Sequence, residues 1–363
     1  MSSDRIIRIG IIGAGFARTT QIPGFQACPG AKIVAIASAH RENAEKVARD
    51  FGIDHVESGW RTLVARDDID LVSIVTPVVT HHEITLAALD HGKAVLCEKP
   101  MAMNADEAKS MTERAREAGV LALIDHELRF LPGRLKMREL VRRGEIGKVR
   151  HVKTTFRSDS RSGPERPWNW WSDSKQGGGA LGAIGSHVID GWRWLLETEV
   201  TEVIGNLVTH IRERKDGSGQ VREVTTDDET NLLVRFKDGE FTEGASGNGS
   251  MSMVEAGKPE HRLELFGSKG ALMIEEGGEL WQSKVGDGDW RRVETDQGDL
   301  AAGMRDGGWA RGFTAFSKRI VEALQEGRTT VEGAATFEDG YRTQLVLDAA
   351  RRAHESGCWA RID

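Results

Sequence analysis

The first 125 residues alternate between short apolar runs and amphipathic stretches, and this alternation constrains the fold more than any other feature. The apolar runs have the length of strands and lie at Ile6–Ile12, Lys32–Ala37, Leu71–Val75, Ala94–Cys97 and Val120–Ile124. Helical patterns separate them at Glu42–Phe51, Trp60–Ala65, His81–His91 and Asp106–Ala118. Apolar strands that alternate with helices belong in a parallel sheet covered on both faces. We therefore predict an N-terminal doubly wound α/β domain of the Rossmann type over residues 1–125.

The pattern changes after Ile124, and strands with turn signals between them then dominate. We expect these strands at Val149–Phe156, Val203–Arg212, Thr230–Phe236, His261–Phe266, Ala271–Glu275 and Glu279–Gln282. A basic helix over Arg134–Arg142 precedes them, and two helices over Gly307–Gln325 and Ala335–Ser356 close the chain. A chain of 363 residues is too long for one ordinary core. We predict a second α/β domain over 126–363, with a mainly antiparallel open sheet.

Composition excludes several classes of protein. The net charge of −7 argues against a general nucleic-acid binder or a binder of anionic membranes. The three cysteines form no C-x-x-C pair, and no H-E-x-x-H motif is present, so neither a disulfide framework nor a metal site is expected. No apolar run approaches the roughly 20 residues of a membrane span, and no signal peptide is evident. We expect a cytoplasmic protein.

A glycine turn, Gly13-Ala14-Gly15, follows the first strand and leads into Phe16-Ala17-Arg18. Glycines let the backbone approach a pyrophosphate, and the following helix N-terminus supplies amide donors. The G-x-G-x-x-G/A pattern requires a third small residue, but Arg18 stands at that position. The small residue Ala17 lies one position earlier, and we interpret this as a turn shortened by one residue. We predict that Gly13, Gly15, Phe16 and Ala17 bind a dinucleotide. The alternative is a strand–turn–helix without a ligand.

The end of the second strand reads Ser38-Ala39-His40-Arg41. An acidic residue at this place holds the ribose hydroxyls of NAD, whereas small and basic residues admit the 2′-phosphate of NADP. No carboxylate is present here, so Ser38 and Arg41 favour NADP over NAD. The alternative for Arg41 is a solvated residue in the first turn of the next helix.

Two further strand ends carry candidate residues. Thr76, Pro77 and His81 follow the strand at Leu71–Val75, and we expect them to border the nicotinamide ribose. His81 could instead start a helix and face water. Glu98-Lys99-Pro100 follows the next strand, and a lysine at this place points into the crevice where open α/β sheets bind ligands. Pro100 restricts the backbone, and we expect a cis Lys99–Pro100 bond.

A glycine-rich segment, Gly177–Asp190, is the main candidate in the second half. Such glycine density is typical of backbone that packs close to a ligand or to another backbone. We expect a helix from about Ser186, with His187 near its start and Asp190 one turn later. Imidazole is the natural proton acceptor near neutral pH. The alternative for His187 is a residue that caps a structural turn.

Together these motifs resemble the glucose–fructose oxidoreductase/inositol dehydrogenase (Gfo/Idh/MocA) family over nearly the whole chain. The matching segments are Gly13-x-Gly15, Thr76-Pro77 with His81, Gly92–Pro100, Arg129-Phe130-x-Pro132, Gly144–Gly147, Gly177–Asp190 and Leu263–Gly270. The resemblance implies a Rossmann domain, a C-terminal open-sheet domain that often mediates homodimers or homotetramers, and sugar, cyclitol or polyol substrates. It also implies that Lys99 is the catalytic lysine and that His187 is the histidine of the D-x-G-x-H segment. This chain departs from the family at Ala183, where an Asp is usual, and at Val78, where an Asn is usual.

These assignments predict an oxidoreductase that uses NADP or NAD and moves a hydride between the nicotinamide and a secondary alcohol or carbonyl. His187 would take the hydroxyl proton, and Lys99 would stabilise the negative charge that develops on the same oxygen. Glu98 belongs to the lysine motif at the cofactor. The weaker candidates for the polyol side are Asp125, His126, Arg129, Trp168 and Asp190. Two alternatives stay open, which are an enzyme of the same fold that cleaves glycosides by redox-assisted elimination and a non-catalytic nucleotide-sensing regulator.

Overall fold

The computed structural model describes residues 5–275 and 277–362, and it divides the chain into two compact units. Unit 1 contains the chain up to Leu131 together with Gly298–Tyr341, and unit 2 contains Pro132–Gln297 and the chain from Arg342. The expected division at residues 125 and 126 therefore falls a few residues early. It also assigns Gly298–Tyr341 to the second domain, although this segment packs with the first. The cause is packing, because α9 (Gly308–Gln325) buries Phe313 and Phe316 in the core of unit 1.

Unit 1 is built on a seven-stranded sheet in the order β17-β6-β5-β4-β1-β2-β3. Its six consecutive strands are parallel, and β17 (Ala335–Thr336) adds to β6 in the antiparallel direction. This order confirms the predicted Rossmann-type sheet and reverses between β1 and β4, which makes the ends of these two strands the topological switch point. The strands are β1 (Ile7–Ile12), β2 (Ala31–Ala37), β3 (His55–Val56), β4 (Leu71–Ile74), β5 (Ala94–Cys97) and β6 (Ala122–Ile124).

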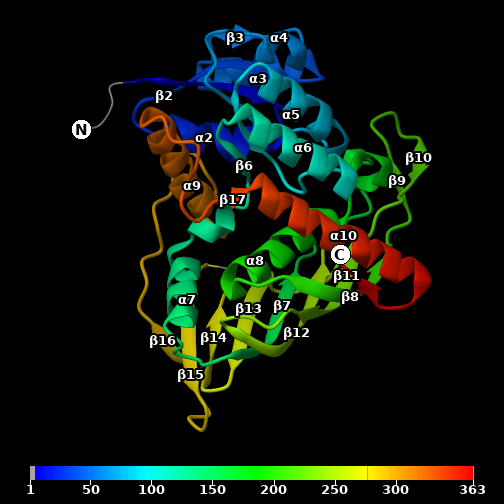
Figure 1. The fold of residues 1–363 in the computed structure, drawn as a ribbon. Coiled ribbons are helices and arrows are strands. Elements are labelled where there is room, and N and C mark those ends of the chain that lie inside the picture. The colour runs from blue at the N-terminus through cyan, green and yellow to red at the C-terminus, as the bar shows by residue number, and fades with distance from the viewer. Residues whose placement is uncertain (1–4, 276, 363) are drawn as a thin grey trace. The chain divides into compact units, whose positions relative to one another are not determined.

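Helices cover both faces of this sheet and bury a separate apolar cluster on each (Figure 1). Residues of α2, α3 and α9 pack on one face, where Phe25 and Phe313 meet edge to face with ring centroids 5.4 Å apart. Residues of α4, α5 and α6 pack on the other face. The remaining helices of this unit are α1 (Phe16–Thr19), α2 (Gln21–Gln26), α3 (Arg41–Phe51), α4 (Trp60–Val64), η1 (Val78–Thr80), α5 (His81–Asp90), α6 (Ala105–Ala118) and η2 (Glu127–Phe130).

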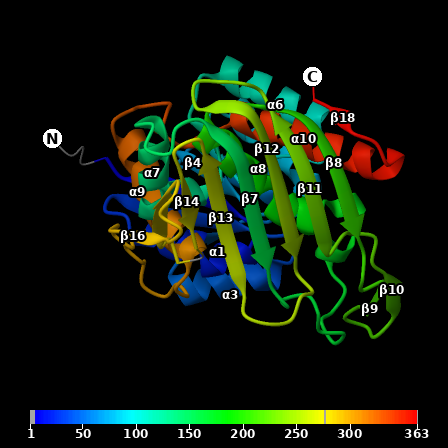
Figure 2. The same cartoon turned by 90° about the horizontal axis from the view of Figure 1, so that it is seen from below.

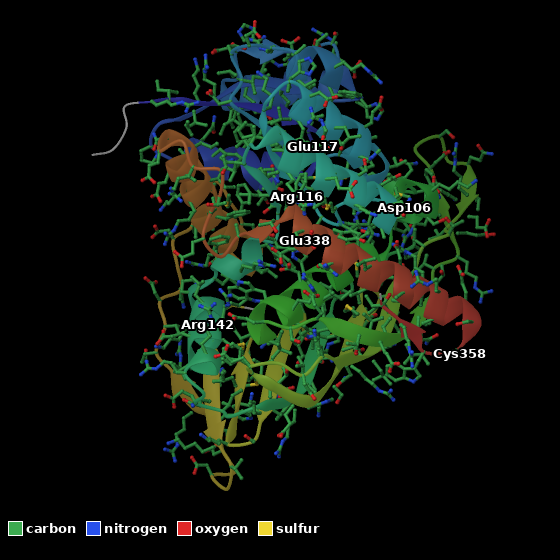
Figure 3. All side chains as sticks on the ribbon, in the orientation of Figure 1. Asp106, Arg116, Glu117, Arg142, Glu338 and Cys358 are labelled. Atoms are coloured by element: carbon green, nitrogen blue, oxygen red, sulfur yellow. The ribbon has the colours of Figure 1, made fainter. Side chains whose placement is uncertain are left out.

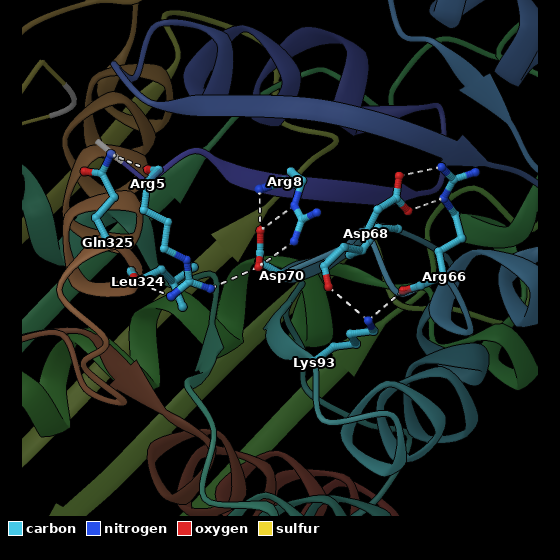
Figure 4. Close-up of polar contacts among 9 residues, drawn as sticks. Arg5, Arg8, Arg66, Asp68, Asp70, Lys93, Leu324 and Gln325 are labelled. Atoms are coloured by element: carbon cyan, nitrogen blue, oxygen red, sulfur yellow. Dashed lines mark hydrogen bonds and ion pairs between the residues drawn. The ribbon is translucent and has the colours of Figure 1, made fainter. Parts of the chain in front are cut away.

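Polar side chains tie together the amino ends of the central strands (Figure 4). Asp70, just before β4, accepts hydrogen bonds from Arg5 and Arg8. Burial raises the pKa of Asp70, but the hydrogen bonds from these arginines outweigh it and hold the pKa below its usual value. Lys93, just before β5, donates to the carbonyl oxygens of Arg66 and Ile69. The amino edge of the sheet is thus closed by its own polar contacts, which leaves the carboxyl edge for a ligand.

Unit 2 contains a nine-stranded sheet in the order β16-β15-β14-β13-β7-β12-β11-β8-β18, seen face on in Figure 2. Neighbouring strands are antiparallel except β7 and β12, so the predicted mainly antiparallel sheet is confirmed. A separate two-stranded ribbon pairs β9 with β10. The strands are β7 (Val149–Arg157), β8 (Val200–Val208), β9 (Glu213–Lys215), β10 (Val221–Glu223), β11 (Glu229–Phe236), β12 (Thr242–Ser252), β13 (Glu260–Gly267), β14 (Gly270–Ile274), β15 (Leu280–Lys284), β16 (Arg291–Val293) and β18 (Ala360–Arg361).

Strand β12 was missing from the sequence prediction, although it lies at the centre of this sheet. Its sequence is rich in Gly and Ser, which have low β propensity. The structure explains the glycines, because a Cβ at Gly249 would lie 3.1 Å from the ring of Trp192. Trp192 is fully buried and its indole N–H donates to Thr154 Oγ1 at 2.8 Å. The small residues of β12 therefore make room for a large core side chain.

In the part of the chain that the structure describes, three α-helices and three short helical turns complete the fold. They are α7 (Pro132–Arg142), η3 (Trp170–Ser172), η4 (Ser174–Gln176), a π-helical turn η5 (Leu181–Gly185), α8 (Ser186–Leu196) and α10 (Phe337–Ser356). The last helix begins at Phe337 rather than at the expected Ala335, because Ala335 and Thr336 pair with β6. Its first turn places Glu338 3.8 Å from Arg116 of α6 (Figure 3). Among the described residues, no helix has both the length and the apolar character needed to cross a membrane.

Candidate functional site

The glycine turn lies at the switch point of the sheet in unit 1. Gly13 has a φ of +112°, and a Cβ there would lie 2.1 Å from the carbonyl oxygen of Val75, at the end of β4. The backbone N–H of Gly13 donates to the carbonyl of Ala37, at the end of β2. Only glycine fits both this conformation and this approach. The turn is therefore packed against the carboxyl ends of two neighbouring strands.

The residues after the turn leave space for a ligand. Around Gly15, a Cβ would meet no heavy atom within 4 Å. Phe16 is 44% exposed, whereas Ala17 is buried in the core below it. The helical segment after the turn is broken, because α1 ends at Thr19 and α2 begins at Gln21 after a break at Thr20. The glycine conformation and the open space over Gly15 suit the close approach of a dinucleotide pyrophosphate.

Arg41 and Ser38 lie at the end of β2, as predicted. Arg41 is the first residue of α3, and its Nε lies 2.8 Å from Glu45 Oε1 in an exposed ion pair. Ser38 Oγ accepts a hydrogen bond from the backbone N–H of His40 at 3.3 Å. The tip of β2 carries no carboxylate. The ion pair with Glu45 is one turn along the same helix, so Arg41 is held at the surface.

His81 is fully buried, so the alternative of a helix-start residue that faces water is wrong. Its Nδ1 lies 3.1 Å from the carbonyl oxygen of Pro100, and its Nε2 lies 2.9 Å from that of Thr76. Burial lowers the pKa of His81, which favours the neutral ring with one N–H donor. The neutral imidazole lies between the segment after β4 and the segment after β5, and it can donate to only one of the two carbonyl oxygens. The Lys99–Pro100 bond is cis, as expected.

The backbone at Lys99 is anchored by a buried network of polar side chains. Gln21 of α2 donates through its Nε2 to Glu98 Oε1 at 2.9 Å and to Asp125 Oδ2 at 2.8 Å. Its own carbonyl oxygen accepts a hydrogen bond from Ser73 of β4. The other oxygen of Glu98 accepts from the backbone N–H of Lys99 at 3.3 Å. One carboxamide therefore connects the carboxyl ends of three strands beneath the lysine.

The two carboxyl groups bridged by Gln21 cannot easily both be ionised. Glu98 is 7% exposed and Asp125 is 1% exposed. Burial, together with the charges of Glu127 and Glu98, raises the pKa of Asp125 well above its usual value. Burial also raises the pKa of Glu98, while the charge of Lys99 opposes this rise. Two like charges in one dry site favour sharing a single proton.

Asp125 is the better place for that proton. Its Oδ1 is buried and accepts no hydrogen bond from the described residues, whereas both oxygens of Glu98 accept one. Burial and the nearby charges of Glu127 and Glu98 raise the pKa of Asp125, whereas the charge of Lys99 opposes the rise at Glu98, so the proton favours Asp125. The pair then presents a single negative charge next to Lys99.

The other substrate-side predictions in unit 1 lie in η2 or next to it. His126 is 2% exposed and Arg129 is 4% exposed. Arg129 forms an ion pair with Asp339 of α10, with its Nη2 3.3 Å from Asp339 Oδ1. This contact connects η2 to the Gly298–Tyr341 segment of unit 1. Arg129 therefore has a structural role, whether or not it also contacts a substrate.

In unit 2, the helix that carries His187 begins earlier than the expected Ser186. The π-helical turn η5 runs directly into α8, so the helical segment starts at Leu181. Asp227 fixes this start, because its carboxylate accepts the backbone N–H of Leu181 at 2.7 Å. His187 is 3% exposed and is the second residue of α8.

The neighbours of His187 differ in how they are packed. Asp190, one turn later, is 2% exposed. Ala183, one turn earlier, is partly buried and packs against the apolar core of unit 2. Trp168 donates from its indole N–H to the carbonyl of Glu223 at 2.9 Å, so it packs on the β9–β10 ribbon. Sequence reasoning missed Gln21, Ser73 and Asp227, whose partners are distant in the chain.

Two family models match the sequence of this chain. The model described as "Oxidoreductase family, NAD-binding Rossmann fold" (GFO_IDH_MocA) matches residues 7–126. The model described as "GFO/IDH/MocA C-terminal domain" matches residues 135–273. Together they cover most of both units.

Several proteins are similar to this chain over nearly its whole length. A levoglucosan dehydrogenase of Pseudarthrobacter phenanthrenivorans is 29% identical and aligns over 98% of both chains. A crystal structure of an oxidoreductase domain protein from Kribbella flavida has a TM-score of 0.88 at 30% identity, covering 99% of this chain and 100% of that one. A levoglucosan dehydrogenase in complex with NADH and levoglucosan has a TM-score of 0.87 at 26% identity, with coverage of 99% and 100%.

Replacing Asp125 with Asn tests the shared proton through stability. An acid whose pKa is raised on folding binds its proton more tightly when folded, so its contribution to stability falls as pH rises above the unfolded value near 4. The Asn side chain would imitate the protonated carboxyl, because it is uncharged and its oxygen can still accept from Gln21. We expect the melting temperature of Asp125→Asn, relative to wild type, to increase between pH 4 and pH 7. The increase should be about 2–4 °C for each kcal/mol of destabilisation that the substitution removes.

Asp299→Asn is the matched control for thermal unfolding across this pH range. Asp299 is exposed in the same unit, and its hydrogen bond with Lys318 lowers its pKa. Its replacement therefore has no repulsion to relieve, and the control should lose slightly in stability as pH rises. A stability difference for Asp125→Asn that stays flat or falls between pH 4 and pH 7 would contradict the shared proton.

Proposed function

The chain belongs to the Gfo/Idh/MocA family of NAD-binding oxidoreductases, and on this premise we propose that it acts on a sugar or a related polyol. The proposed reaction moves a hydride between nicotinamide and a secondary alcohol or carbonyl of that substrate. The similarity to levoglucosan dehydrogenase supports the substrate class. The proposal depends mainly on the position of Lys99. Glu98 accepts a hydrogen bond from the backbone N–H of Lys99, and both lie at the same edge of the sheet as the glycine turn.

The spacing within unit 1 supports this assignment. The glycine turn follows β1 and Lys99 follows β5, and these strands flank β4. Neighbouring strands lie about 4.8 Å apart, so the two strand ends are separated by roughly 10 Å. Gly13, Gly15 and Phe16 would hold the pyrophosphate side of the cofactor, whereas Ala17 is buried beneath them. Thr76, Pro77 and Glu98-Lys99 would border the nicotinamide side, with His81 acting through the two segments between which it lies.

The bound nicotinamide supplies the hydride acceptor or donor, and the protein must handle one proton. We assign two roles to side chains of this chain. Lys99 would donate a hydrogen bond to the reacting oxygen and stabilise the negative charge that develops on it. His187 would accept the hydroxyl proton during oxidation and return it during reduction. Because Ala183 replaces the usual Asp, no carboxylate at that position supports the imidazole, and Lys99 carries more of the electrostatic work.

We predict that Lys99→Met and His187→Ala each lower the maximal rate of hydride transfer by about 10²–10⁴-fold. NADH affinity should stay nearly unchanged, because neither side chain is assigned to the pyrophosphate. Stopped-flow absorbance with a sugar that the wild type oxidises measures the rate, and fluorescence titration measures NADH binding. Lys109→Met and His82→Ala are matched controls. Lys109 is exposed on α6, and His82 lies on α5 with its ring in contact with Ser110 of α6. Unchanged rates in both variants would refute the assignment.

We also propose that the end of β2 admits NADP in addition to NAD. The tip has no carboxylate, and Arg41 is engaged in an exposed ion pair, which costs about 0–1 kcal/mol to break. Arg41→Ala should weaken NADPH binding by about tenfold or more, since charge-assisted hydrogen bonds contribute roughly 1.5–3 kcal/mol. It should leave NADH binding almost unaffected. Glu45→Gln should instead strengthen NADPH binding, because it releases Arg41.

Calorimetric titration of both nucleotides against the three proteins checks this cofactor proposal. If Arg41→Ala changes NADH and NADPH binding equally, Arg41 is a surface residue without a role in selection. If the wild type binds NADH alone, the enzyme is specific for NAD and the lean towards NADP is wrong.

We propose a homodimer or homotetramer formed through the nine-stranded sheet. One face of this sheet is buried in the core of unit 2, while Leu233 on β11 is 51% exposed. Light scattering of the purified protein at micromolar concentration measures the mass. A multimeric mass that Leu233→Lys reduces would support the proposal, and a monomeric wild type would contradict it.

A further inference from the structure

An arginine in unit 2 has a setting that suits a bound anion. The guanidinium of Arg161 lies over the ring of Trp171, 4.0 Å from its centroid. Among the described residues, no carboxylate forms an ion pair with Arg161, and the charges that act on it are those of Arg166 and Arg214. Burial and these two like charges lower the pKa of Arg161 to about 10. The guanidinium of Arg161 is therefore poorly hydrated and is surrounded by the positive charges of Arg166 and Arg214.

Arg214, near Arg161, directs its hydrogen bonds to backbone carbonyl groups. Arg214 is 4% exposed, and its guanidinium donates to the carbonyl oxygens of Gly163, Arg166 and Arg161. Burial, reinforced by Arg166, lowers its pKa as well, and the charge of Asp228 opposes this only in part. The carboxylate of Asp228 is occupied by the backbone N–H groups of His210 and Ile211. Arg214 thus shapes the loop that carries Arg161 and adds positive potential to it.

The frame around Arg161 is rigid rather than loose. The backbone N–H of Arg161 donates to the carbonyl of Met253 at 2.8 Å. Trp171 is held by a hydrogen bond from Thr226 Oγ1 to its carbonyl oxygen at 3.0 Å. A Cβ at Gly178 would lie 2.2 Å from that same oxygen, so the glycine segment packs directly against Trp171. The hydroxyl of Ser162 is buried and has no hydrogen-bond partner within the described chain.

This combination has a specific chemical meaning. A guanidinium presents its N–H donors in a planar fork that matches the oxygens of a carboxylate or phosphate. Stacking on an indole fixes the plane of the fork, and partial removal of water strengthens its attraction for an anion. The nearby positive charges favour an anionic ligand further. A neutral ligand would leave this repulsion in place.

We propose that Arg161 forms an oxyanion subsite, and that the substrate is a sugar bearing a carboxylate or phosphate group. This rests on the proposed function, because it concerns the substrate of the same reaction. Trp171 backs onto Gly178, and the helical segment that carries His187 begins just beyond, at Leu181. Arg161 therefore contacts the aromatic residue that packs against the glycine segment leading into the helix of His187.

The test compares glucose, glucuronate, glucose 6-phosphate and inorganic phosphate as ligands of the NADH-bound enzyme. Calorimetric titration measures binding to wild type, Arg161→Gln and Arg161→Lys. Arg150→Gln is the matched control, since Arg150 is an exposed arginine of the same unit that pairs with Glu243. We expect one of the anionic sugars to bind about 10–100-fold more tightly than glucose in wild type and in the control.

Arg161→Gln should abolish this preference and leave glucose binding unchanged. Arg161→Lys should keep part of it, because the charge remains while the planar fork is lost. Thermal unfolding checks the fold, and Arg161→Gln should be at least as stable as wild type because it removes a repelled charge. If Arg161→Gln proves unfolded, Arg161→Lys carries the comparison.

Equal binding of glucose and both anionic sugars by wild type would overturn the proposal, as would an anionic preference that survives in Arg161→Gln. Inorganic phosphate that binds as tightly as either anionic sugar would assign the subsite to a free anion and overturn the assignment of the substrate. Arg161-dependent binding of an anionic sugar without NAD-linked turnover would keep the subsite and refute the proposed function. The two failures are therefore distinguishable.

Discussion

The carboxamide of Gln21 is the contact on which the candidate site of unit 1 depends. It receives a hydrogen bond from Ser73 of β4 and donates to Glu98 after β5 and Asp125 after β6. A buried amide that lost one of these partners would cost free energy, so all three strand ends are held in one arrangement. Lys99 is positioned as a result, because its backbone N–H donates to Glu98. The protein thus fixes the backbone at Lys99 through a shared polar core rather than through local backbone alone.

The fold was predictable where one local signal decided it. Fully buried parallel strands such as β1 and β4 are apolar along most of their length, so their sequences reveal them. Strand β12 was not predictable, because small residues such as Gly249 make room for Trp192 and have low β propensity. The packing of α9 with the first unit also depends on contacts between residues far apart in the chain. Periodicity carries no information about such contacts.

The same distinction holds for the candidate site. The glycine turn and the Glu98-Lys99-Pro100 motif are contiguous, so the sequence predicts them and their place at strand ends. The partners Gln21, Ser73 and Asp125 come from three different segments, and no spacing connects them. His81 shows the limit of residue type as a guide, because a histidine after a strand end suggested a cofactor contact or a solvated helix start. It is buried between two carbonyl oxygens, which excludes the solvated helix start.

We expect the pair bridged by Gln21 to hold one proton beneath Lys99 at pH 7. Infrared spectroscopy distinguishes the two states, because a protonated carboxyl and a carboxylate absorb in separate regions. A shared proton would give a protonated-carboxyl band in wild type at pH 7 that disappears in Asp125→Asn and shifts in Glu98→Gln. Carboxylate bands alone at pH 7, with no band that depends on these two residues, would contradict it.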